Sequence, residues 1–271
     1  MFLRNQHVLI TGGSSGIGLA LARQCSSEGA RVSIVGRDAS KLQAARNLVE
    51  QEVPGSPVFT ASADVASEAQ VMAAVAAAQR AHGPVDVLIA SAGTAVPGHF
   101  ESLPTAVFER SMAVNYMGIV HAAKAVVPGL RTAGRGAVVM ISSGAGLVGL
   151  FGYTAYSPSK FAVRGFAEAL RAELAPCGVH VMIVYPPDTD TPQLAEESLT
   201  KPVETRALTA GGGLWTADAV ARATLDGLRR RRFSVTPGIQ LTALRWFQSL
   251  VDPILRWSFD RTAAKARRNK A

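Results

Sequence analysis

Two hydrophobic patterns alternate along this chain. Short runs rich in Val, Ile and Leu recur between longer alanine-rich stretches in which apolar residues repeat with helical spacing. The first pattern is typical of buried strands and the second of amphipathic helices. We expect strands at 7–11, 31–35, 57–61, 85–90, 136–142, 179–185 and 233–236, and helices at 16–29, 39–52, 67–81, 104–130, 155–175 and 216–230.

This order of elements predicts an α/β fold built from repeated βα units. Right-handed crossovers would give a Rossmann-type, doubly wound parallel sheet of about seven strands with helices on both faces, and ligands at the carboxyl ends of the strands. No repeat, linker or composition break precedes about residue 240. We therefore expect one catalytic domain over residues 1–240 and a tail over residues 241–271.

The bulk composition excludes several classes of protein. With 48% hydrophobic and 18% charged residues, a chain of 271 residues is globular rather than disordered. Cys25 and Cys177 lie far apart, which argues against a disulfide framework or a structural zinc site, and we expect no metal. No apolar run reaches the ~18 residues of a spanning helix, and no secretory apolar region follows Met1, so we expect a cytoplasmic protein.

The net charge of +8 belongs to one segment. Residues 229–271 carry a net charge of +9, whereas the remainder carries −1. Apolar side chains in this basic segment follow roughly helical spacing: Trp246, Phe247, Leu250, Val251, Ile254, Leu255, Trp257 and Phe259. Such a segment suits an amphipathic anchor on an anionic membrane, although a cover over a cleft or a dimer contact explains it equally well. No recognition motif accompanies the charge, so nucleic acid is not an expected partner.

A glycine-rich turn follows the first expected strand directly. The run Thr-Gly-Gly-Ser-Ser-Gly-Ile-Gly spans residues 11–18 and opens a helix, with glycines at 12, 13, 16 and 18. Gly12, Gly16 and Gly18 permit a tight turn and close approach of the backbone to a pyrophosphate, which would bind at the helix N-terminus. The flanking strand and helix favour a nucleotide site over a plain loop.

A second group of polar residues lies between Ser142 and Lys160. It supplies a hydroxyl at Ser143, a phenol at Tyr156 and an ammonium at Lys160. Residues four apart share one face of a helix, so Lys160 would lie near Tyr156, favour the phenolate and lower the pKa of the phenol. These three groups are suited to protonating a carbonyl oxygen.

The two motifs together resemble the short-chain dehydrogenase/reductase family over roughly residues 5–236. The resemblance implies an oxidoreductase with the catalytic residues Asn115, Ser143, Tyr156 and Lys160, in which Asn115 bends a helix and holds a water against the lysine. It also implies a homo-oligomer, a dimer or tetramer, paired through helices 104–130 and 155–175. The cofactor-binding residues that it implies are Gly12, Ser14, Ser15, Gly16, Ile17, Gly18, Arg37, Asp64, Val65, Ala92, Gly93, Tyr156, Lys160, Pro186 and Thr191.

The end of the second expected strand indicates which cofactor binds. Arg37 stands where an acid would read the ribose 2′-hydroxyl of NAD, and a guanidinium there can pair with a 2′-phosphate. We therefore expect NADPH, although the neighbouring Asp38 weakens the argument. The chain also departs from the family, because Ala90 and Ser91 replace two asparagines of an Asn-Asn-Ala-Gly motif.

One further run narrows the substrate class. The sequence Tyr-Pro-Pro-Asp-Thr-Asp-Thr-Pro at 185–192 resembles the 3-ketodihydrosphingosine (3-dehydrosphinganine) reductases, as does Leu-Phe-Gly-Tyr-Thr-Ala-Tyr-Ser at 150–157. That resemblance implies NADPH-dependent reduction of a long-chain amino-ketone in sphingolipid synthesis. The basic, apolar segment 229–271 adds the expectation of peripheral contact with an anionic membrane. Two alternatives stay open: a reductase of another acyl ketone, such as a 3-oxoacyl thioester, and a cofactor-bound membrane scaffold with little activity.

The segment 187–213 is expected to be a substrate lid. Gly211, Gly212 and Gly213 would form its hinge. Its acidic residues could attract the protonated amine of an amino-ketone, or could simply face solvent; they are Asp188, Asp190, Glu196 and Glu197.

Overall fold

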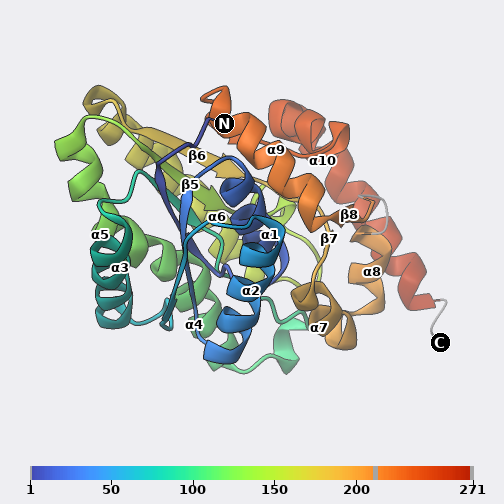
Figure 1. Cartoon of the computed structure of the whole chain (residues 1–271). Coiled ribbons are helices and arrows are strands. Elements are labelled where there is room, and N and C mark those ends of the chain that lie inside the picture. Colours follow the sequence, from blue (N-terminus) through green and yellow to red (C-terminus); the bar gives the residue numbers. More distant parts are fainter. Residues whose placement is uncertain (1, 210–212, 269–271) are drawn as a thin grey trace.

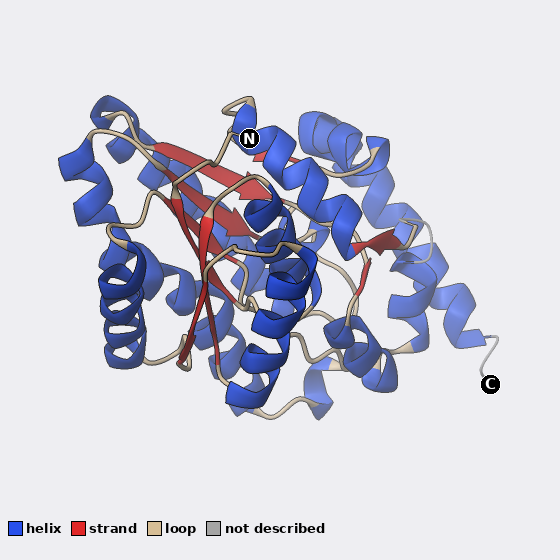
Figure 2. Cartoon of the chain, viewed as in Figure 1, coloured by secondary structure: helices blue, strands red, loops and turns tan. Residues whose placement is uncertain are grey.

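The computed structural model describes residues 2–209 and 213–268. Seven parallel strands form one central sheet in the order β3-β2-β1-β4-β5-β6-β9. Figure 2 shows this sheet between two layers of helices. Its strands are β1 (His7–Thr11), β2 (Arg31–Gly36), β3 (Val58–Ser62), β4 (Val87–Ala90), β5 (Ala137–Ile141), β6 (His180–Val184) and β9 (Ser234–Val235). The predicted doubly wound α/β fold is confirmed.

Alternating side chains of each buried strand separate two hydrophobic cores. In β1, Val8 and Ile10 pack into one core and Leu9 into the other, because successive side chains of a strand point to opposite faces. The first core is covered by α1 (Gly16–Ser27), α2 (Ala39–Glu52) and α9 (Ala217–Arg229). The second is covered by α3 (Glu68–His82), α5 (Gly118–Ala133) and α6 (Tyr156–Leu174).

The helix expected at 104–130 is interrupted. It consists of α4 (Thr105–Met112), a π-helical turn η2 (Ala113–Met117) and α5. Asn115 stands in the middle of the π-helical turn, which agrees with the predicted bend at this residue. Short π-helical turns are frequent at functional sites. Further 3-10 turns are η1 (Phe100–Ser102), η3 (Gly144–Gly146) and η4 (Ala175–Cys177).

The segment expected as a lid contains more regular structure than predicted. It carries β7 (Thr189–Asp190), α7 (Pro192–Thr200) and α8 (Val203–Thr209), and β7 pairs with β8 (Trp215–Thr216) in a second, two-stranded sheet. This pairing holds the two ends of the segment side by side. Of the expected hinge, Gly211 and Gly212 lie outside the described residues, and Gly213 has a positive φ of 71°.

The basic segment ends in one long helix. Helix α10 (Ile239–Arg268) contacts α8, and Figure 1 shows it on the side of the molecule opposite α3 and α5. The expected boundary at residue 240 therefore falls within its first turn. None of the described helices is long and apolar enough to cross a bilayer.

Candidate active site

One cavity of about 520 Å³ lies at the carboxyl ends of the central strands. Its walls come from the turn after β1, the loops after β4, β5 and β6, helix α7 and helix α10. Every predicted site residue except Asn115 lines it: Gly12, Ser14, Ser15, Gly16, Ile17, Gly18, Arg37, Asp64, Val65, Ala92, Gly93, Ser143, Tyr156, Lys160, Pro186 and Thr191. The structure thus brings the two sequence motifs together in one site.

The glycine turn packs tightly against two other walls of this cavity. A Cβ on Gly12 would lie 2.7 Å from the Ala92 nitrogen, and one on Gly16 would lie 2.9 Å from the Thr191 Cγ2 atom. Gly12 and Gly16 also have positive φ angles of 70° and 53°, which disfavour other residues. Larger residues at these two positions would therefore clash with Ala92 and Thr191 and push the turn away from the other walls of the cavity.

The N-terminus of α1 opens toward the same space. Ser15 occupies the N-cap position, yet its side chain makes no capping hydrogen bond. The first-turn N–H groups of a helix have no partners within the helix and, with its dipole, attract an anion. This end of the cavity fits the pyrophosphate of a dinucleotide.

At the end of β2, the adjacent side chains of Arg37 and Asp38 make different contacts. The Asp38 carboxylate caps α2: it accepts hydrogen bonds from the Ser40 nitrogen at 2.9 Å, the Ser40 hydroxyl at 2.6 Å and the Lys41 nitrogen at 3.1 Å. The hydrogen bond from the Ser40 hydroxyl is the main cause that lowers the pKa of Asp38. Arg37, by contrast, is exposed and lines the cavity. The Asp38 carboxylate is therefore bound to the N-terminus of α2, whereas Arg37 faces the space where a ligand would bind.

Asp64 and Val65 follow β3 at the same end of the cavity. Arg110 pairs with the Asp64 carboxylate at 2.9 Å, and the Ala66 nitrogen donates to the same side chain at 3.0 Å. These bonds hold the loop after β3 in place beside Arg37.

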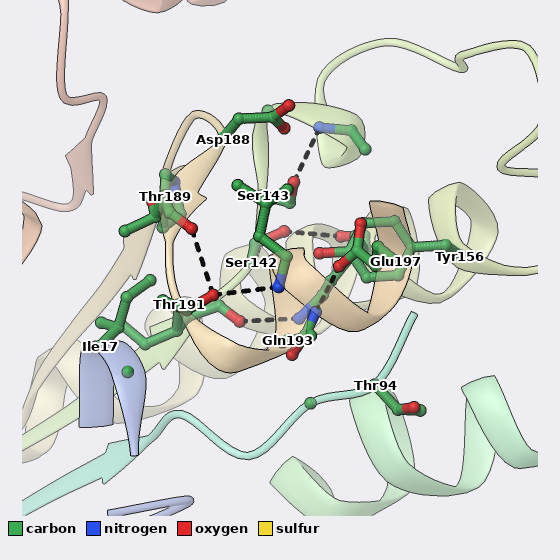
Figure 3. A pocket seen from close by; sticks show the side chains of 18 of the residues that line it. Ile17, Thr94, Ser142, Ser143, Tyr156, Asp188, Thr189, Thr191, Gln193 and Glu197 are labelled. Atoms are coloured by element: carbon green, nitrogen blue, oxygen red, sulfur yellow. Dashed lines mark hydrogen bonds between the residues drawn. The ribbon is translucent and has the colours of Figure 1, made fainter. Parts of the chain in front are cut away.

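Tyr156, Ser143 and Lys160 form a compact group at the start of α6. Tyr156 is the first residue of the helix, and the Lys160 Nζ atom lies 5.5 Å from the centroid of its ring. Ser143 follows β5 and hydrogen-bonds to Tyr156. Pro158 falls within the first turn, where a missing N–H costs nothing. Figure 3 shows Ser143, Tyr156 and Glu197 facing one space.

Burial shifts the pKa values of this pair in ways that residue spacing does not predict. It lowers the pKa of Lys160 to about 8, because a buried ammonium loses its hydration. Burial also raises the pKa of Tyr156 above its ordinary value, the nearby Glu197 carboxylate adds to this, and only the Ser143 hydrogen bond opposes it. The expectation that Lys160 lowers the pKa of Tyr156 was therefore wrong for this structure: the cost of burying a phenolate is larger.

Asn115 lies behind the cavity wall and is fully buried. Its side chain donates to the Thr94 oxygen and to the Ser159 hydroxyl, both at 2.9 Å, and accepts from the Thr94 nitrogen at 2.8 Å. It therefore braces the loop after β4 against α6. A Cβ on Gly93 would lie 3.4 Å from the Asn115 Oδ1 atom and 3.6 Å from the Lys160 Nζ atom, so both atoms face the same small space.

Four acidic residues were candidates for binding an amine, and the structure separates them. Asp190 and Glu196 are exposed and do not line the cavity. Asp188 lines it but forms an ion pair with Lys201 at 3.0 Å. Glu197 lines the cavity and is only 7% exposed.

Sequence reasoning did not assign several cavity residues to the site. Tyr153 and Gln193 hold the Glu197 carboxylate, each by a hydrogen bond of 2.9 Å. Apolar side chains from α10 complete the wall: Leu241, Leu244, Leu255 and Phe259. From the sequence, this tail was expected to be a membrane anchor, with a cover over a cleft or a dimer contact as alternatives. Its helical spacing did not say which face would point inward.

Comparisons with known proteins agree with this geometry. A family model described as "short chain dehydrogenase" matches residues 6–202. The 3-dehydrosphinganine reductase of Danio rerio is 42% identical over 93% of this chain and 78% of its own length, and the 3-ketodihydrosphingosine reductase of Mus musculus is 42% identical over 87% and 72%. A solved short-chain dehydrogenase from Sphingobium yanoikuyae in complex with NADPH superposes with a TM-score of 0.78 at 29% identity, covering 94% of this chain and 95% of that one.

The buried ammonium of Lys160 leads to a prediction about stability. Because the pKa is lowered from 10.5 to about 8, the folded protein carries the full cost of the buried charge below pH 8 and loses that cost as pH rises toward 10.5. Lys160→Met should therefore stabilise the cofactor-free protein at pH 7 by up to about 3 kcal/mol, and this gain should shrink above pH 8. Denaturant unfolding at several pH values measures it.

The matched control is Lys124→Met, which changes an exposed lysine paired with Glu68. It should give no pH-dependent gain. A Lys160→Met variant that is less stable than the wild type at pH 7 would show that the hydrogen bond from Lys160 to the Ile141 oxygen outweighs the burial cost.

Proposed function

This chain belongs to the short-chain dehydrogenase family, and we propose that it reduces the 3-keto group of 3-ketodihydrosphingosine to dihydrosphingosine with NADPH. The observation that carries the proposal is a single cavity that joins a dinucleotide-type turn, a carbonyl-protonating group and an apolar wall from α10. The choice of substrate is supported by the names of the relatives that are 42% identical over most of this chain.

The chemistry assigned to the chain's own residues is a proton transfer. When bound, NADPH supplies the hydride that reaches the carbonyl carbon. The Tyr156 hydroxyl then donates its proton to the carbonyl oxygen, and Ser143 hydrogen-bonds that oxygen. The raised pKa of Tyr156 keeps the phenol protonated, as a general acid must be. We assign Lys160 to the nicotinamide ribose and to the charge beside Tyr156, and Asn115 to the positioning of both through its bonds to Thr94 and Ser159.

Replacing the phenol tests this assignment. Tyr156→Phe should lower kcat for 3-ketodihydrosphingosine by about 10²–10⁴-fold, because a positioned general acid contributes that much. NADPH binding, followed by the fluorescence of the nicotinamide, should persist. The control Tyr116→Phe alters a phenol whose ring meets Phe166 edge to face outside the cavity, and it should leave kcat unchanged. Undiminished turnover by Tyr156→Phe would remove the assignment.

We propose NADPH rather than NADH because of the different contacts of Arg37 and Asp38. The Asp38 carboxylate is occupied by the N-terminus of α2, whereas the Arg37 guanidinium is available to pair with a 2′-phosphate. The NADPH-bound neighbour from Sphingobium yanoikuyae supports the same choice. The other cofactor contacts proposed from the sequence line the same cavity.

Arg37→Ala should raise KM for NADPH about 10- to 100-fold, the usual range for the loss of a charge-assisted hydrogen bond, and should leave KM for NADH nearly unchanged. Steady-state kinetics with both cofactors measures this. Arg46→Ala serves as the control, because Arg46 lies on α2 and pairs with Glu50. Equal changes for both cofactors would contradict the proposed role of Arg37.

We propose that α10 also contacts an anionic membrane. While one side of this helix lines the cavity, large apolar side chains elsewhere on it are exposed, including Trp246 at 78% and Trp257 at 58%. The surrounding segment carries a net charge of +9. Exposed aromatic residues together with basic charge favour binding in the plane of an anionic interface.

Vesicle sedimentation of the full chain tests this contact. Replacing Trp246 and Trp257 together by Ser should lower the partition coefficient on phosphatidylserine-containing vesicles at least about tenfold, because two large apolar groups no longer enter the interface. Met72→Ser, on α3 at the opposite side of the molecule, should bind like the wild type. Equal partitioning of all three proteins would contradict the proposal.

The expected homo-oligomer stays a prediction. It is supported by partly exposed apolar side chains on the two helical segments that were expected to pair, namely Met112, Met117 and Phe161.

The division into a catalytic domain (1–240) with a lid (187–213) and a tail (241–271) also stays a proposal. Because side chains of α10 line the cavity, we propose further that the tail forms part of the cavity wall.

A further inference from the structure

Glu197 is a buried carboxylate that lines the cavity. Its two oxygens accept hydrogen bonds from the neutral groups of Tyr153 and Gln193, at 2.9 Å each. Within residues 2–209 and 213–268, no basic side chain forms an ion pair with it. Buried charges are normally paired, because removing them from water is costly. A positive group brought by a ligand would satisfy this one.

The two neighbouring lysines are already engaged elsewhere. The Lys201 Nζ atom pairs with Asp188 at 3.0 Å and lies 5.7 Å from the centroid of the Tyr153 ring. Lys160 feels the Glu197 charge, which raises its pKa against the larger effect of burial, but its ammonium donates to the Ile141 oxygen at 3.2 Å. Asp188 is thus paired with Lys201, whereas the Glu197 carboxylate is held by two neutral groups and faces the ligand space.

Glu197 also lies close to the reacting centre. Its charge acts on Tyr156, and the ring of its partner Tyr153 contacts the Tyr156 ring, with the centroids 5.3 Å apart and the ring planes at 49°. In Figure 3, Glu197 and Tyr156 lie side by side. In a 2-amino-3-ketone the ammonium is on the carbon next to the carbonyl. A ketone oxygen held by Tyr156 and Ser143 would therefore place such an ammonium within reach of this carboxylate.

We propose that Glu197 binds the ammonium of a 2-amino-3-ketone substrate and so selects amino-ketones over ketones that lack the amine. This inference rests on the proposed function and adds a specificity residue to it. Tyr153 and Gln193 act as positioning residues, since they hold the two carboxylate oxygens. A substrate without the amine leaves the buried carboxylate unpaired, and a polar site rejects such analogues strongly.

The experiment compares two ketones of equal chain length, 3-ketodihydrosphingosine and 1-hydroxyoctadecan-3-one, which lacks the amine. In the wild type, kcat/KM should favour the amino-ketone at least about 100-fold. Glu197→Gln should lower kcat/KM for the amino-ketone by a similar factor, mainly through KM, and should leave the amine-free ketone unchanged or faster. Glu196→Gln is the matched control: the neighbouring carboxylate is exposed, and both ratios should stay at the wild-type value.

Glu197→Asp keeps the charge and should retain most of the preference for the amine, so the proposal can be tested even if the glutamine variant does not fold. NADPH binding by each variant reports on folding. Equal loss of kcat/KM for both ketones, or a wild type with less than about tenfold preference, would overturn the role of Glu197 while leaving the proposed reduction in place. A wild type that does not reduce 3-ketodihydrosphingosine at all would instead refute the proposed function.

Discussion

The site depends on one packing constraint, the attachment of α6 to the end of β5 at Lys160. The Lys160 ammonium donates to the Ile141 oxygen, and the Ser142 hydroxyl donates to the Lys160 oxygen. These two bonds join the last residue of the strand and its successor to the first turns of the helix. They hold Tyr156 beside Ser143 at the carboxyl edge of the sheet. They also keep Lys160 buried, which costs stability but places a positive charge near the phenol.

Much of this arrangement could be predicted from sequence because it depends on local patterns. Alternating residues of β1 assign Val8 and Leu9 to different cores, and the glycine run identifies the turn before α1. The bend at Asn115 was also predicted, but from the family resemblance; the residue pattern indicated only that an asparagine in the middle of a helix has a tertiary role. The alternation in β1 and the glycine turn depend only on residues close together in the sequence and on the repeat lengths of strands and helices.

Features that depend on burial or on distant contacts could not be predicted. The direction of the Tyr156 pKa is set by desolvation, which the four-residue spacing to Lys160 does not reveal. Helices α7 and α8 lie in a segment whose prolines and acidic residues indicate a loop; Thr191 caps the first of them. The separate environments of Glu196 and Glu197, adjacent in sequence, follow from the direction in which α7 packs.

Under the proposed function, the cavity has a polar end and an apolar wall suited to one amphiphilic molecule. Tyr156, Ser143 and Glu197 form the polar part, while Leu241 and Phe259 belong to the apolar wall from α10, a helix that also exposes Trp246 and Trp257. The most direct test is to incubate the wild-type protein with NADPH and either 3-ketodihydrosphingosine or a 3-oxoacyl thioester, and to measure kcat/KM for each. We predict consumption of NADPH with formation of dihydrosphingosine and a clear preference for the amino-ketone. Turnover of the thioester alone would contradict the account.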